Sequence, residues 1–164
     1  MAVRRCLPFP HACLRAKARP VQTVTPEVKE IWQDMVDTME AMPGVGLAAP
    51  QIGVSLALAV VDASQERGEV IYLANPKIVH SSDALIDWEE ASPNLPGVYS
   101  VITRPQSVRV AFMDKKGEPV ERDFSDLWSI SVQHQIDHLQ GKLYFDQLSR
   151  TKRDILLRKA RKIK

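Results

Sequence analysis

The chain has 164 residues, enough to bury a core, and we predict a single domain over residues 1–164. Hydrophobic residues make up 45% and charged residues 26%, as in ordinary globular proteins, and the net charge of +2 does not indicate a nucleic-acid partner. No apolar run approaches the length of a membrane span, and the N-terminus lacks the apolar segment of a signal peptide, so we expect a cytoplasmic protein that binds neither DNA nor a membrane.

The segment before the first predicted helix is rich in proline and arginine, and residues 1–24 are expected to run extended over the surface. Its two cysteines fit no common zinc spacing and are too few for a disulfide framework, so we predict reduced thiols. Thr25–Glu27 combines an N-cap threonine, a proline at the first helical position and an acid in the first turn, which together predict a helix start. Apolar residues then recur at helical spacing, and the helix is expected to end near Met42, before Pro43.

A run of small residues follows this helix, from Gly44 to Gln51. Two glycines and two alanines within so short a run indicate a backbone that a ligand or another strand approaches closely, or else a tight turn packed against a helix. The spacing alone does not decide between these interpretations.

Apolar segments between turn signals predict strands in the middle of the chain. The segment Ala91–Gly97 is predicted to be a loop, because its two prolines and its glycine disfavour regular pairing. Lys115–Gly117 is predicted to be the turn of a hairpin. The predicted strands are Leu56–Asp62, Val70–Asn75, Ala84–Glu89, Val108–Asp114 and Val120–Phe124.

Two further helices are predicted near the C-terminus. The first, Leu127–Leu139, is expected to be buried on most sides and to end just before Gly141. The second is capped by Ser149 and extends to about Lys162, with cations near its C-terminal end, where they suit the helix dipole. In the simplest interpretation these cations form a solvated basic face. Strands followed by helices that pack on them indicate an α+β fold.

The first of these two helices carries His134 and His138, which are four residues apart and therefore share one face. This spacing lets a helix offer two imidazoles to one metal ion, and in the H-E-x-x-H form the glutamate is the base that acts on the metal-bound water. Gln135 occupies the glutamate position, and an amide cannot take up a proton from water at neutral pH. The pair by itself also fits two histidines on a buried core face.

Three stretches in fixed order resemble the peptide deformylase family, over nearly the whole chain. Gly44–Gln51 is similar to the family's G-φ-G-φ-A-A-x-Q motif, and Gln133–Leu139 to its Q-H-E-x-D-H-L motif. Glu90–Pro96 stands where the family has E-G-C-L-S. The resemblance implies a compact α+β fold in which antiparallel strands surround a central helix with two metal-binding histidines, with further helices near the two ends of the chain.

The resemblance also implies roles for individual residues. In active members, a Cys thiolate and two histidines hold a metal, typically Fe(II), and the enzyme removes formyl groups from N-formylmethionyl peptides. His134 and His138 match the histidine ligands, and Gln51 matches the side-chain donor to the developing oxyanion. The residues assigned to substrate binding are Gly44, Val45, Gly46, Leu47 and Pro93.

Three positions depart from the family pattern. Ser92 replaces the thiolate ligand, and a neutral hydroxyl is not among the usual ligands of such sites. Pro93 has no backbone N–H and cannot act as the second oxyanion donor, and Gln135 replaces the base. Because a base contributes about 10²–10⁴ in rate and one oxyanion donor about 10²–10³, the sequence predicts a homologue without deformylase activity, even when Fe(II) or Ni(II) is supplied. No metal cofactor is expected, and the family metal would be Fe(II) or Zn(II).

Different classes of function remain open for such a site. One is a binding protein that holds an N-terminal peptide as an added strand, or docks on the ribosome surface through its basic C-terminal helix, as bacterial deformylases can. Another is a metal-dependent hydrolase that removes formyl groups at a low rate or with altered chemistry, using Glu89 or Glu90 as a replacement ligand. Both glutamates also fit a solvated strand end, which is the preferred interpretation. A structural zinc site is disfavoured, because only two good ligands remain.

Two sets of contacts are predicted around the histidine helix. If Asp137 is buried it needs a partner, and Arg104 is the predicted one, with a backbone N–H as the alternative. The side chains expected to hydrogen-bond to the two histidines in the absence of metal, besides water, are Gln51, Ser92 and Gln135.

Overall fold

The computed structural model describes residues 2–42 and 44–163, so Pro43, before which the first helix was expected to end, lies outside the described residues. The α-helices are α1 (Pro26–Ala41), α2 (Leu127–Leu139) and α3 (Arg150–Lys162). Shorter 3₁₀ helices lie at Ala12–Leu14, Ala49–Ile52 and Tyr144–Gln147. The strands are β1 (Gly46–Ala48), β2 (Leu58–Val61), β3 (Ile71–Ser81), β4 (Leu85–Ser92), β5 (Leu95–Pro105), β6 (Ser107–Met113) and β7 (Pro119–Ser125).

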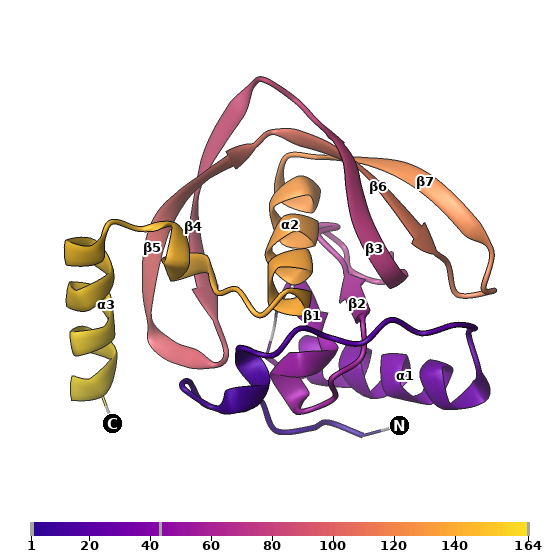
Figure 1. Ribbon diagram of the computed structural model, residues 1–164, viewed down its shortest axis with the longest axis horizontal. Helices are drawn as coiled ribbons and strands as arrows, with labels where there is room; N and C mark the ends of the chain where they lie inside the picture. The colour runs from indigo at the N-terminus through magenta and orange to yellow at the C-terminus, as the bar shows by residue number, and fades with distance from the viewer. Residues whose placement is uncertain (1, 43, 164) are drawn as a thin grey trace.

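The strands form two antiparallel sheets with α2 between them (Figure 1). The larger sheet has the order β1-β2-β3-β6-β7, and β4 and β5 form a separate two-stranded sheet. This arrangement confirms the predicted α+β class with antiparallel strands around the histidine-bearing helix. None of the described helices combines the length and the apolar character that crossing a membrane would need.

Helix α2 begins and ends at the predicted residues, and it is buried almost all round. Its apolar residues Val132, Ile136 and Leu139 pack into one core cluster with side chains of the larger sheet. Most of its polar residues are buried too, and the side chain of His134 lines a cavity. Buried polar side chains need hydrogen-bond partners, from the protein or from a ligand. Helix α2 is therefore the element most suited to carry a functional site.

Helix α1 packs against the first motif. The Thr25 side chain accepts a hydrogen bond from the Val28 N–H at 3.2 Å, and Pro26 occupies the first turn, which confirms the predicted helix start. Apolar side chains of α1 share a core cluster with Leu47 and Leu58. This packing fixes the short strand β1 against the rest of the larger sheet.

The predicted loop at Ala91–Gly97 is wrong, and strand β5 was not predicted at all. Strand β4 continues to Ser92, β5 begins at Leu95, and these two residues pair across a two-residue turn. Pro93 lies in that turn, where no ladder N–H is required, so it does not interrupt pairing. Gly97 adopts a φ of 87° within β5, a conformation that favours glycine. The turn residues therefore allow pairing that their composition argued against.

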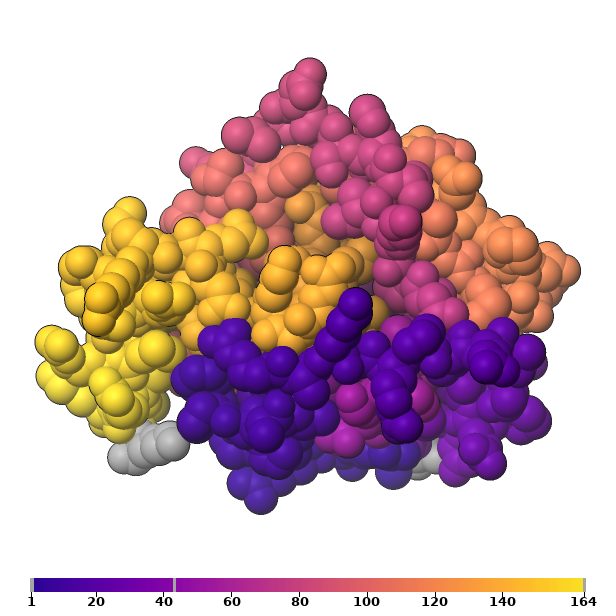
Figure 2. Space-filling model, in the orientation of Figure 1, coloured from indigo at the N-terminus to yellow at the C-terminus, as the bar shows by residue number. Residues whose placement is uncertain are grey.

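The N-terminal segment lies across the surface and contacts the C-terminal part of the chain (Figure 2). The Ala18 N–H donates to the carbonyl of Leu139 at the end of α2, at 2.8 Å. Arg15 forms an ion pair with Asp146, at 2.6 Å. These contacts tie the first residues of the chain to the region just after the histidine helix.

Candidate active site

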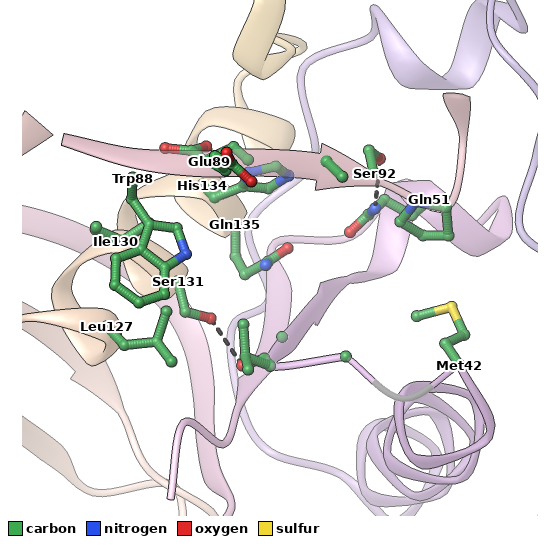
Figure 3. A pocket seen from close by; sticks show the side chains of 16 residues that line it. Met42, Gln51, Trp88, Glu89, Ser92, Leu127, Ile130, Ser131, His134 and Gln135 are labelled. Atoms are coloured by element: carbon green, nitrogen blue, oxygen red, sulfur yellow. Dashed lines mark hydrogen bonds and ion pairs between the residues drawn. The ribbon is translucent and has the colours of Figure 1, made fainter. Parts of the chain in front are cut away.

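A cavity of about 290 Å³ lies between the first motif, strand β4 and helix α2 (Figure 3). All three stretches that carry the family resemblance border it. Two of the residues assigned from the sequence do not line it: Leu47 is fully buried in the core, and His138 lies behind His134. The assigned residues that do line it are Gly44, Val45, Gly46, Gln51, Ser92, Pro93, His134 and Gln135.

The two histidines bring their Nε2 atoms together, 3.1 Å apart. The Nδ1 atom of His134 lies 2.8 Å from the Glu90 carboxylate, which accepts its N–H. The side-chain partners predicted for the histidines, Gln51, Ser92 and Gln135, were therefore wrong. Two nitrogen ligands at about 2.0–2.1 Å from one ion, in tetrahedral geometry, would lie roughly 3.3 Å apart, so this pair fits the approach of a metal.

His138 is held as a neutral imidazole. Burial lowers the pKa of His138 well below its usual value, and the charges of His134, Arg104 and Arg15 act in the same direction. A neutral ring offers the lone pair that a metal ligand needs. The Nδ1 atom of His138 is buried and has no hydrogen-bond partner among the described residues.

A buried ionic chain fixes the position of His134. Arg104 donates to Asp137 at 2.9 Å, which confirms the predicted pair, and its other nitrogens donate to Glu90. Burial alone would raise the pKa of Glu90, but the hydrogen bonds from His134 and Arg104 outweigh it and lower that pKa. Carboxylates commonly orient metal-ligating histidines in this way. Glu90 is 4% exposed, so the expectation of a solvated strand end was wrong for it, whereas Glu89 is exposed.

Glu90 and Tyr144 also contact His134. The sequence did not predict that Glu90 would orient this histidine or that Tyr144 would stack on it. Both Glu90 oxygens are engaged by Arg104, so its part is to hold the ring of His134 rather than to replace the missing ligand. The ring of Tyr144 stacks on His134 with centroids 5.9 Å apart. Burial, followed by the charge of Glu90, raises the pKa of Tyr144 to about 12, so its hydroxyl stays protonated.

Ser92 and Gln51 belong to a second group of hydrogen-bonded polar side chains that also borders the cavity. The Gln51 Nε2 donates to Asn94 Oδ1 at 2.7 Å. The same nitrogen lies 3.5 Å from the Ser92 hydroxyl, as Figure 3 shows. Ser92 itself donates to Asn94 at 3.2 Å. Within residues 2–42 and 44–163, no three His, Cys, Asp or Glu side chains form a metal-binding group. The spacing of the two imidazoles fits a metal, but a hydroxyl stands at the position of the family's third ligand.

Gln135 lies on the cavity wall beside Gly46. It is 4% exposed, and its side-chain Oε1 has no hydrogen-bond partner among the described residues. Such a buried acceptor is satisfied when a donor enters the cavity, from water or from a ligand N–H.

Position 46 in β1 must be glycine because helix α2 packs closely against it, whether or not a ligand is bound. A Cβ on Gly46 would lie 2.5 Å from the Ser131 hydroxyl oxygen and 2.6 Å from the Gln135 Nε2. The Ser131 hydroxyl also donates to the Val45 carbonyl at 2.7 Å. The small residues of the first motif thus permit close packing against the histidine helix, as well as an open cavity wall.

We expect Gly46→Ala to lower the free energy of unfolding by about 1–3 kcal/mol, because two buried side chains must move away. Urea unfolding measures this loss. Gly44→Ala is the matched control, because a Cβ there meets its nearest atom at 3.6 Å, an ordinary contact. Adding Ser131→Ala to Gly46→Ala should recover part of the loss. Equal losses for the two glycine variants would contradict this account.

The backbone of the first motif is also anchored from outside the cavity. Arg67 donates to the Gly44 carbonyl at 2.6 Å and to the Asp62 carbonyl at 2.8 Å. The side chain of Asp62 accepts hydrogen bonds from Ser64 and from the Gly68 N–H, which hold the turn that carries Arg67. Burial alone would raise the pKa of Asp62, but these hydrogen bonds outweigh it and lower that pKa.

The lowered pKa of Asp62 makes its contribution to stability pH-dependent. The contribution is present above the unfolded-state pKa of about 3.9 and is lost as the pH falls through the folded-state value. We expect Asp62→Asn to cost about 1 kcal/mol at pH 7, because the partly exposed donors of the turn lose a charged acceptor, and to cost less at pH 3. Urea unfolding at both pH values tests this, and an equal cost at both would contradict it.

Comparison with known proteins places these features in one family. The profile of the polypeptide deformylase family matches residues 3–154. A peptide deformylase of Phenylobacterium zucineum is 39% identical, with 99% of this chain and 97% of the relative covered. A peptide deformylase of Afipia carboxidovorans is 40% identical, with 97% and 94% covered.

Solved structures agree over the same length. The crystal structure of a peptide deformylase from Legionella pneumophila matches with a TM-score of 0.93 at 41% identity, covering 99% of this chain and 95% of that one. The peptide deformylase of Ehrlichia chaffeensis in complex with actinonin matches with a TM-score of 0.94 at 30% identity, covering 100% and 99%.

These relatives contradict the sequence-based hypothesis of an inactive homologue. That hypothesis rested on Ser92, Pro93 and Gln135 alone, whereas proteins about 40% identical over nearly their whole length are peptide deformylases. The alternative of a hydrolase with altered chemistry is the better supported of the two. From the profile match, the relatives and the shared fold, the chain belongs to the polypeptide deformylase family.

Proposed function

We propose that this protein is a metal-dependent hydrolase that removes formyl groups from N-formylmethionyl peptides, with proton transfer and carbonyl binding altered by Gln135 and Pro93. The observation that carries the proposal is the convergence of the His134 and His138 Nε2 atoms, 3.1 Å apart, behind a cavity bordered by all three family motifs. Family membership supports the same activity.

His134 and His138 are the residues that would hold the metal, with the Ser92 hydroxyl as the nearest counterpart of the third ligand. Imidazole ligands suit both Zn(II) and Fe(II). A bound ion of this kind polarises a carbonyl oxygen and lowers the pKa of a bound water. The Glu90 carboxylate keeps His134 in the tautomer whose Nε2 carries a lone pair, as a metal ligand would need.

The other side chains of the cavity bind and orient the substrate. Gln51 offers an amide N–H toward the position of a carbonyl oxygen, and Gln135 offers its unpaired Oε1 to a substrate N–H. Gln135 cannot accept a proton from water. Among the described lining residues, Glu89 is the carboxylate that forms no ion pair or hydrogen bond. Glu89 or solvent therefore takes the proton that Gln135 cannot accept.

Formate release from formyl-Met-Ala-Ser tests the proposal. The metal-free protein is reconstituted separately with Zn(II) and, without oxygen, with Fe(II), and bound metal is quantified in each sample. We expect metal-dependent formate release, none from the metal-free protein, and none from the unformylated peptide. Stoichiometric metal without formate release above background would reject the proposal.

A further inference from the structure

Asn94, in the turn between β4 and β5, is fully engaged by hydrogen bonds on the far side of Gln51. It is 1% exposed. Its Oδ1 accepts from the Gln51 Nε2 at 2.7 Å and from the Ser92 hydroxyl at 3.2 Å. Its Nδ2 donates to the carbonyl oxygens of Leu7 and Gln51. With both ends of the amide occupied, the orientation of the Asn94 side chain is fixed.

The Gln51 amide is fixed in turn. Its Oε1 accepts the Ala48 N–H at 2.9 Å, which identifies the other atom as the nitrogen. An amide nitrogen carries two hydrogens, and Asn94 takes one of them. Among the residues that the structure describes, the second is opposed only by the Ser92 hydroxyl at 3.5 Å, which is a weak contact. Gln51 therefore has one N–H held by the protein and one available at the cavity wall.

We propose that Asn94 is a positioning residue for Gln51, which holds the amide so that its second N–H is presented to a substrate carbonyl in the cavity. Its catalytic part rests on the proposed function, whereas the orientation of Gln51 is a property of the protein alone. Pro93 has no N–H, so Gln51 is the donor that remains of the family's pair. A single preorganised donor must be well aligned to stabilise developing charge.

Kinetics in two backgrounds separate positioning from a structural role. Asn94→Ala should lower kcat by about 10- to 100-fold, because the donor loses its alignment. In the Gln51→Ala background the same change should alter kcat by less than about threefold, since there is no amide left to position. Asn94→Asp keeps the acceptor that faces Gln51 but loses the donor to the Leu7 and Gln51 carbonyls, so it should restore only part of kcat. Equal losses of kcat in the two backgrounds would overturn the proposal.

Asn75 provides the matched control. Its side chain accepts from the Val21 N–H at 2.8 Å and donates to the Val21 carbonyl at 2.6 Å, away from the cavity. Its φ is 52°, so Asn75→Gly removes the side chain without adding backbone strain. This variant should lose stability and keep kcat. A comparable loss of kcat would show that destabilisation alone lowers turnover, which would overturn the positioning role.

NMR of the metal-free protein tests the orientation without activity. The two Nε2 hydrogens of Gln51 should give distinct signals, one of them slowly exchanging because Asn94 accepts it. Asn94→Ala should remove that protection. Unchanged Gln51 signals in Asn94→Ala would overturn the inference. If the protein released no formate but the signals responded as expected, the proposed function would fail and the positioning of Gln51 would stand.

Discussion

Replacing His138 by alanine is expected to abolish stoichiometric metal binding and to lower formate release by at least about 10³-fold, because a bound metal contributes several kcal/mol to stabilising the reacting carbonyl. With Ser92 in place of a thiolate, the two imidazoles are the strong ligands, so neither is redundant. Metal content after dialysis and formate release from the reconstituted protein measure the two effects. Their joint loss would connect the metal to the activity.

The control for this change is His80→Ala, on the exposed part of β3 and away from the cavity. It should leave both metal content and turnover unchanged. Because His138 is 1% exposed, its loss leaves a hole, so circular dichroism must first show that the variant is folded. His134→Ala provides a second, independent test of the pair. A folded His138→Ala protein with full metal content would contradict the assignment of this ligand.

The helices were predictable because their signals are local. Thr25, Pro26 and Ser149 act within one turn of their own positions, and both α1 and α3 begin where these residues predict. Strand β5 carries no comparable signal, since a proline and a glycine follow its first residue and it contains the charged Arg104. That arginine is buried because Glu90 and Asp137, far away in the sequence, pair with it. Only the folded chain brings those charges together.

The candidate site was predictable in outline for the same reason. The histidine spacing and the first motif located its walls, and the pairing of Arg104 with Asp137 was inferred correctly. The roles of Glu90 and Asn94 depend on which atoms face each other across β4, α2 and the first motif, and no sequence spacing records this. The hypothesis of an inactive homologue rested on three substitutions, and the sequence did not reveal the ionic chain that still orients His134.

Gln135→Glu is expected to raise kcat for formate release by about 10²–10⁴-fold, because it adds a general base beside the histidine pair. If His134 and His138 hold a metal, a base at position 135 has a proton to accept. The rate should acquire an acidic limb, falling where the new carboxylate becomes protonated. Steady-state kinetics across pH measure both effects.

Gln135→Glu should also lower the free energy of unfolding of the metal-free protein, and urea unfolding measures this loss independently of turnover. Position 135 is 4% exposed and its side-chain oxygen has no partner within residues 2–42 and 44–163, so an added carboxylate is buried without compensation. Burial raises the pKa of such a group, so its cost is absent at low pH and grows as the pH rises above the unfolded-state value of about 4.3. Bound metal should offset that cost by supplying an opposite charge. A variant equally stable with and without metal, and no faster than the parent, would show that position 135 does not face the reacting centre.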